Sequence, residues 1–130
     1  MQVGGNHYEG KVQHWDFCWE HKYNQFEYCV TKYVFRCFKK NGLEDLKKAQ
    51  HHLYKYMEFV GKCHGLPGRK TSDASIWCES YDLSAAQLFI ITCVHVGYLD
   101  EAKDGLAKLI SRLEHEANEQ PPREYVNPDL

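Results

Sequence analysis

The feature that most constrains this chain is a helical repeat of apolar residues on either side of a short turn. In each stretch the apolar residues recur every three or four positions, which places them on one face of a helix. The first stripe consists of Phe26, Val30, Tyr33, Val34 and Cys37, and the second of Leu46, Ala49, Leu53, Tyr56 or Met57, and Val60. Neighbouring helices with such stripes bury them against each other, so the pattern predicts a helical hairpin.

The turn between the stripes has signals of its own. Asn41 and Gly42 tolerate positive φ, so they predict the end of the first helix. The second helix is expected to begin at about Leu43. Glu44 and Asp45 then fall in its first turn, where the helix dipole favours negative charge.

The second half of the chain repeats this pattern. Residues 78–88 align with residues 18–28, and residues 99–114 align with residues 43–58, with one four-residue deletion between the two blocks. Either an internal duplication or the sequence pattern common to all helical hairpins explains the match. The halves differ in charge, because Thr92 and Val96 replace Lys32 and Arg36 of the first hairpin. The helix expected over residues 85–96 is apolar nearly all round, which predicts that it is buried at the centre of the fold.

These patterns predict an all-α fold, a compact helical bundle of two hairpins in a single domain over residues 1–130. No strand pattern competes with it. The expected segments are an extended start (2–14), short helices at about 15–23 and 72–81, a first basic half (1–63), a helix-breaking connector (64–71), a second apolar half (72–118), and a flexible tail (119–130).

Composition excludes several classes of protein. The chain carries 26% charged residues and a net charge of −2, which argues against general nucleic-acid binding. Its cations are concentrated between residues 31 and 48, whereas acids dominate after residue 99, so an anionic partner should meet the first half. No apolar run is long enough to span a membrane, and the first 14 residues lack the apolar core of a signal peptide. We therefore expect a soluble, cytoplasmic protein.

The cysteines and histidines do not predict a metal site. No two of the six cysteines have the two-residue spacing of a zinc site, and His51 and His52 point in different directions on a helix. Reduced core thiols are the expected state of the cysteines. The cysteines are Cys18, Cys29, Cys37, Cys63, Cys78 and Cys93.

A row of cations is the main candidate for a functional site. Lys32, Arg36 and Lys39, with Lys40 beside them, line up opposite the first apolar stripe, where Gln25 also lies. Such a row is either a solvated helix face or an anion site. Arg36 would contribute most to an anion site, because its guanidinium can bind two phosphate oxygens at once.

The glycine-rich start of the chain spells GxxxxGK between Gly5 and Lys11, but it does not predict a P-loop. Val12 stands where a magnesium-binding Ser or Thr is required, and no apolar strand precedes the motif. The backbone amides of this segment could still wrap a ligand, and His7, Tyr8 and Lys11 offer polar and stacking groups.

Two runs of residues together resemble a known family. They are His7-Tyr8 with Gly10-Lys11-Val12-Gln13-His14-Trp15-Asp16-Phe17, and Lys32-Tyr33-x-x-Arg36-x-x-Lys39-Lys40-Asn41-Gly42-Leu43-Glu44-Asp45-Leu46-Lys47-Lys48-Ala49. In these runs the chain resembles the small phage-encoded nucleotide kinase-like family, which includes a podovirus enzyme that phosphorylates deoxynucleoside monophosphates without a P-loop. The resemblance covers roughly residues 6–59. Cys29 departs from it, since members often have Asn shortly before the Lys-Tyr pair.

The resemblance implies a nucleotide site on the first hairpin. It implies phosphoryl transfer from a nucleoside triphosphate to a deoxynucleoside monophosphate, with Lys32, Arg36 and Asp45 as the catalytic residues. Magnesium would arrive with the nucleotide, or the cations would replace it. The expected nucleotide-binding residues are His7, Tyr8, Lys11, Trp15, Lys32, Tyr33, Arg36, Lys39, Lys40 and Lys48.

Two other functions remain open at this stage. A non-catalytic protein that sequesters a nucleotide signal of host defence would use the same cations, and a protein-interaction module would present them to an acidic surface. Because the first hairpin supplies only part of a pocket, a homo-oligomer is expected to complete it. A phage-encoded protein of this kind would act in the host cytoplasm.

Overall fold

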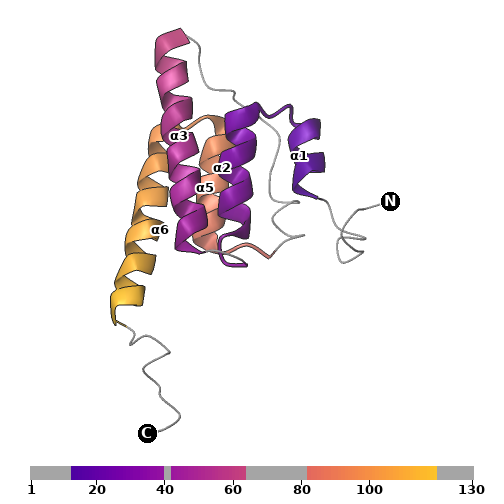
Figure 1. Cartoon of the computed structure of the whole chain (residues 1–130). Helices are drawn as coiled ribbons and strands as arrows, with labels where there is room; N and C mark the ends of the chain where they lie inside the picture. The colour runs from indigo at the N-terminus through magenta and orange to yellow at the C-terminus, as the bar shows by residue number, and fades with distance from the viewer. Residues whose placement is uncertain (1–12, 40–41, 64–81, 120–130) are drawn as a thin grey trace, which may run out of the picture.

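The computed structural model describes residues 13–39, 42–63 and 82–119. They form five helices and no strand, which confirms the predicted all-α bundle: α1 (His14–Glu20), α2 (Gln25–Arg36), α3 (Leu43–Cys63), α5 (Ala85–Val96) and α6 (Leu99–Glu119). The last four form a bundle in which α2 and α6 each pack against both α3 and α5, and α1 flanks α2 (Figure 1). Within these ranges no helix is both long and apolar enough to cross a bilayer. The predictions for residues 1–12, 64–81 and 120–130 lie outside the described residues.

The two apolar stripes of the first hairpin form the core as predicted. Val30, Val34 and Cys37 of the first stripe are buried, and Phe26 and Tyr33 are partly buried at its edges. In the second stripe, the side chains of Leu46, Ala49, Leu53 and Tyr56 are buried, while Met57 and Val60 pack against them from the rim. Burial of these stripes holds α2 against α3.

The helix α5 is less buried than its sequence predicts. It packs against α2 and α6 and buries Ile90, Ile91 and Val94 between them. Its remaining surface carries Phe89, which is 52% exposed, and Thr92, which is also exposed. The prediction of burial all round is therefore wrong for this face. Apolar composition shows what a helix can bury, but the number of neighbours decides what it does bury.

The two hairpins have equal helix lengths and the same type of N-terminal cap on their short helices. Both short helices have 12 residues and both long helices have 21. Each short helix begins with a reciprocal capping box, formed by Asn24 with Glu27 in α2 and by Ser84 with Gln87 in α5. The residues two positions before the caps, Lys22 and Asp82, have φ of 56° and 55°. The N-terminal caps and the backbone before them therefore match in the two hairpins, as the sequence alignment of the two halves predicts.

Gln87 joins the two hairpins. Its side-chain Oε1 accepts a hydrogen bond from the Ser84 backbone N–H, while its Nε2 donates to the carbonyl oxygens of Val34 and Phe35 at 2.9 and 3.2 Å. The last carbonyls of a helix have no partner within the helix itself. A buried side chain of α5 therefore caps the end of α2 and fixes how the two short helices meet.

Replacing Gln87 by Ala should destabilise the whole bundle. The variant loses the α5 cap and leaves two α2 carbonyls without this donor in the interior, so the free energy of unfolding should fall by about 2–4 kcal/mol. Chemical denaturation followed by circular dichroism measures the change. Gln25→Ala is the matched control, because Gln25 is exposed and its loss should cost no more than about 0.5 kcal/mol. Equal effects of the two substitutions would contradict the role of Gln87.

Candidate functional site

Three cations from two helices meet around one aromatic ring. The Arg36 guanidinium carbon lies 5.0 Å from the centre of the Tyr33 ring, and the amino nitrogens of Lys32 and Lys48 each lie 5.7 Å from it. The His52 ring is 5.6 Å from the same ring. Lys32 and Arg36 are one turn apart on α2, and Lys48 and His52 are one turn apart on α3, so the hairpin brings both pairs to Tyr33. We call these five residues the Tyr33 cluster.

The cluster favours an anionic ligand. A cation above a tyrosine ring gains only about 0.5–1 kcal/mol at an exposed site. The three cations outnumber the two carboxylates beside them, Asp45 and Glu44, so a bound anion would balance the remaining positive charge. Two cations of the predicted row, Lys32 and Arg36, therefore lie with Lys48 around the Tyr33 ring.

Arg36 is held in place by a buried carboxylate. Its Nη2 lies 3.3 Å from Oδ1 of Asp45, whose side chain has no exposed surface, while 28% of the Arg36 side chain is exposed. The Nε of Arg36 is buried and has no hydrogen-bond partner among the described residues. Asp45 was predicted as a catalytic residue, but in this arrangement it positions Arg36 and does not face a ligand.

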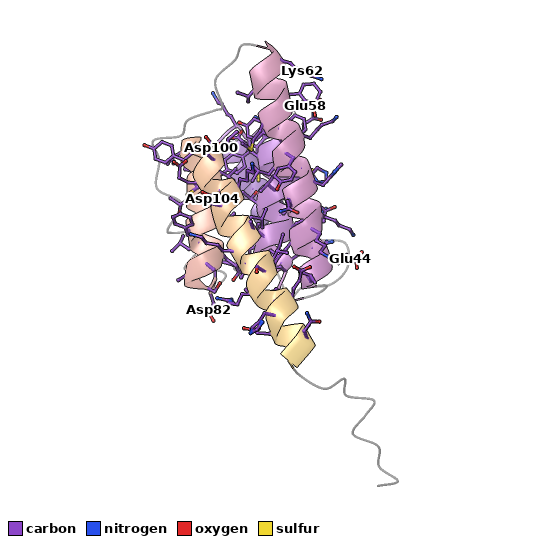
Figure 2. All side chains as sticks on the ribbon, turned by 90° about the vertical axis from the view of Figure 1, so that its left-hand side faces the viewer. Glu44, Glu58, Lys62, Asp82, Asp100 and Asp104 are labelled. Carbon is purple, nitrogen blue, oxygen red and sulfur yellow. The ribbon has the colours of Figure 1, made fainter. Side chains whose placement is uncertain are left out.

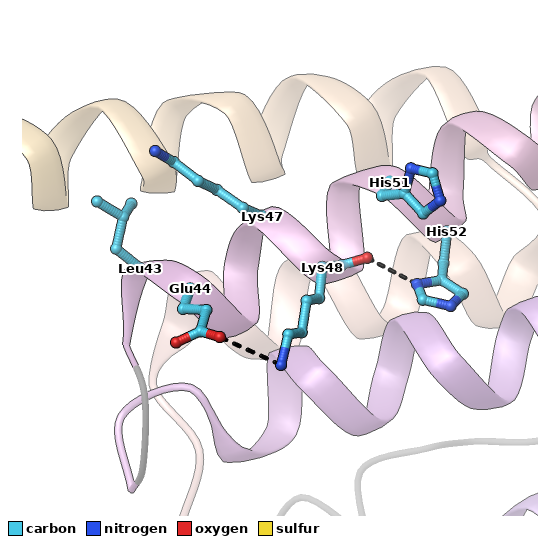
Figure 3. Close-up of a pocket in the computed structure, with 6 residues that line it drawn as sticks. All are labelled: Leu43, Glu44, Lys47, Lys48, His51 and His52. Carbon is cyan, nitrogen blue, oxygen red and sulfur yellow. Dashed lines mark hydrogen bonds and ion pairs between the residues drawn. The ribbon is translucent and has the colours of Figure 1, made fainter.

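Lys48 has a weaker partner. Its amino group lies 3.3 Å from Oε1 of Glu44, one turn earlier on α3, and both side chains are well exposed. Exposed ion pairs of this kind contribute little stability, so Lys48 can turn from Glu44 to a ligand at small cost. A shallow depression of about 480 Å³ lies beside this pair. Its lining residues are Leu43, Glu44, Lys47, Lys48, His51 and His52 (Figure 3).

The hydrogen bond of His52 defines its tautomer. Its Nδ1 lies 2.8 Å from the carbonyl oxygen of Lys48, and a carbonyl can only accept, so Nδ1 carries the proton (Figure 3). In the neutral ring the lone pair then resides on Nε2. His52 thus offers an acceptor at the edge of the cluster.

The remaining predicted residues are not gathered there. Lys39 is exposed and its amino nitrogen lies 5.0 Å from the Phe35 ring, so the row of cations divides between Tyr33 and Phe35. Trp15 lies on α1 and is 58% exposed, whereas the contacts of the cluster come from α2 and α3. The predicted residues His7, Tyr8, Lys11 and Lys40 lie outside the described residues.

Two residues near Lys32 were missed from the sequence. The Tyr28 ring lies 5.9 Å from the Lys32 amino group, a contact that the four-residue spacing on α2 could have predicted. His14 of α1 is hydrogen bonded to the Thr31 hydroxyl at 2.7 Å, and its ring lies 4.9 Å from that of Tyr28. No local pattern predicts the contact of His14, because it arises from the packing of α1 on α2.

Burial, and to a smaller extent the nearby charge of Lys32, lowers the pKa of His14 from 6.5 to about 4. The thiols behave in the opposite sense, since burial raises the pKa of Cys18 to about 12 and that of Cys37 to about 11. Both cysteines are free thiols with little nucleophilic character. Within the three described ranges, no three His, Cys, Asp or Glu side chains lie close enough to hold a metal ion.

Comparison with known proteins gives one match. A family described as a protein of unknown function, DUF3310, matches residues 4–54, which is less than half of the chain. The matched segment includes α1, α2 and the first half of α3, and therefore every residue of the Tyr33 cluster. No curated protein and no solved structure matches the chain. The family description assigns no activity.

The low pKa of His14 should make stability depend on pH. Between about pH 4 and 6.5 the unfolded chain binds a proton at His14 that the folded chain does not, so His14 lowers the free energy of unfolding as the pH falls through this range. The loss should reach roughly 2–3 kcal/mol. Comparing denaturation of the wild type and His14→Gln across these pH values isolates it, because other groups titrate in both proteins. A nuclear magnetic resonance titration midpoint for His14 near 6.5 would contradict the prediction.

Proposed function

We propose that the Tyr33 cluster binds the phosphates of a nucleotide, and that the chain is a nucleotide kinase-like phosphotransferase of the kind its sequence resembles. The observation that carries the proposal is the convergence of Lys32, Arg36 and Lys48 on one ring from two helices. A row of solvated surface cations would have no reason to meet in this way. The match of this segment to a family without an assigned activity is compatible with the proposal.

The chemistry of the cluster suits phosphate better than a single carboxylate. Arg36 presents a planar fork for two phosphate oxygens and is oriented by Asp45. Lys32 of α2 and Lys48 of α3 each place a positive charge 5.7 Å from the centre of the Tyr33 ring. Together they match a ligand with several charged oxygens, such as a nucleoside monophosphate or the terminal phosphates of a triphosphate.

Phosphoryl transfer between nucleotides requires little more of a protein than a site that binds several phosphate oxygens. The donor and the acceptor must be held in line, and the charge on the transferred group must be stabilised. The acceptor phosphate has a second pKa of about 6, so it is already ionised at neutral pH and needs no general base. Magnesium carried by the triphosphate would bridge phosphate oxygens and neutralise part of their charge. We propose that Trp15 and Lys39 contact the rest of the nucleotides. The sequence predicts the same role for His7, Tyr8 and Lys11.

The same geometry also serves binding without catalysis. Asp45, the acid among the proposed catalytic residues, is fully buried and paired with Arg36, so cations, Tyr33 and His52 are the cluster groups that face a ligand. A protein that sequesters a nucleotide signal would need no more than these groups. This is the second candidate function, and it predicts that the ligand is recovered unchanged.

Binding should depend on the cluster and on salt. Replacing Lys48 by Ala, or Arg36 by Lys, should weaken the binding of a deoxynucleoside monophosphate by about 10- to 100-fold, because each loses a charge-assisted hydrogen bond. Isothermal titration calorimetry at two ionic strengths measures the effect. Lys62→Ala is the matched control, since Lys62 is exposed near the end of α3 and away from Tyr33. Equal binding by the variants and the control would remove the cluster as the site.

An activity assay separates the two candidates. The full chain is incubated with each deoxynucleoside monophosphate and a triphosphate with magnesium, and the products are separated by ion-exchange chromatography. A diphosphate product that is lost in Arg36→Lys and kept in Lys62→Ala is expected for the enzyme. Tight binding with unchanged ligand would support sequestration. No binding of any nucleotide would reject both.

A further inference from the structure

A second surface, on the opposite edge of the bundle from α1, is independent of the proposed nucleotide site. An apolar groove of about 510 Å³ runs between α5 and α6. Its floor is formed by Ala85, Ala86, Phe89, Gly105 and Leu109. Figure 2 views this region with α6 in front and α5 beside it.

Phe89 is the dominant side chain of this groove. Its ring packs against α6 at Gly105, where an added Cβ would come within 3.0 Å of two ring carbons. Glycine therefore lets the ring settle on α6, and yet 52% of Phe89 stays exposed. One side of the ring is buried within the chain and the other faces outward, as an aromatic anchor does at a protein interface.

The charges along the rim of the groove are ordered. Glu101 and Asp104 lie at its amino-terminal end, and Lys108 and Arg112 lie at its carboxyl-terminal end, all on α6. Asp104 is labelled on the side of α6 toward α5 in Figure 2. Arg112 also approaches Glu116 at 3.8 Å, a long and exposed pair that leaves it available.

The charges along the rim can pair with those of a second copy, because the acidic end of one rim would meet the basic end of the other. If a second α6 packs antiparallel across a two-fold axis near residue 106, Glu101 faces Arg112 of the other copy and Asp104 faces Lys108. Every such contact then occurs twice, as a closed two-fold interface requires. Gly105 and Phe89 lie close to the axis, so the two Phe89 rings would meet there.

We propose that the α5–α6 groove is the interface of a homodimer, formed by two copies of this chain packed through Phe89 with the rim charges of α6 paired end to end. A strongly acidic or strongly basic partner fits this surface poorly, because one end of the rim would meet a like charge. A second copy matches both ends. The proposal makes no use of the nucleotide cluster, which lies on α2 and α3.

The test measures the mass of the full chain by sedimentation equilibrium over a range of concentrations. The wild type should dimerise, and Phe89→Ser should raise the dimer dissociation constant by at least about tenfold. Trp19→Ser is the control, because Trp19 is 87% exposed on α1 and should leave the mass unchanged. Circular dichroism of each variant shows that it is folded.

A charge exchange tests the antiparallel arrangement. Glu101 and Arg112 are roughly 16 Å apart along one helix, too far to interact within a chain. Glu101→Arg and Arg112→Glu should each weaken the dimer, and the double exchange should restore it, which is only explained by contact between copies. A monomer at all concentrations, a dimer insensitive to Phe89→Ser, or no rescue by the double exchange would each overturn the proposal.

Discussion

The burial of Asp45 is the constraint that links the fold of this protein to its candidate site. A carboxylate with no exposed surface is tolerated only when a cation or several donors accompany it. The first turn of α3 places Asp45 against α2, where its carboxylate pairs with the Arg36 guanidinium. The same contact that lets α3 pack on α2 also fixes the guanidinium beside Tyr33. Packing and ligand geometry are therefore set together, and Lys48 joins them because it lies one turn further along α3.

The two hairpins show how one scaffold carries two surfaces. Their N-terminal caps and helix lengths agree, since these features determine how each hairpin closes on its own core. The exposed positions are under no such constraint. Where the first hairpin has Lys32 and Arg36, the second has Thr92 and Val96, and Asp104 stands in the place of Lys48. Cations gather on one hairpin, whereas the other presents an apolar groove with mixed charges at its rim.

Much of the fold could be predicted from spacing, but the site only in part. The stripe from Leu46 to Tyr56 and the turn at Gly42 are local patterns, and the structure confirms both. The row from Lys32 to Lys39 is also a local pattern, but in the structure its members lie against two different aromatic rings. Lys32 and Arg36 lie on α2, whereas Lys39 lies in the turn after it. Arg36 approaches Asp45 of α3, and Lys39 approaches Phe35. Helical periodicity gives the direction of a side chain from its own axis, and it does not say which neighbour lies there.

The sequence by itself determined the helices, their order, the core stripes and the region in which cations are dense. These depend on interactions within a few turns of one helix, and residue type and spacing record them directly. The tertiary structure alone decided that Asp45 is buried, that Lys48 meets Lys32 and Arg36, that Gln87 caps α2, and that Phe89 remains exposed. Each of these depends on the distance between helices that are remote in the chain, which is set by how all their side chains pack at once.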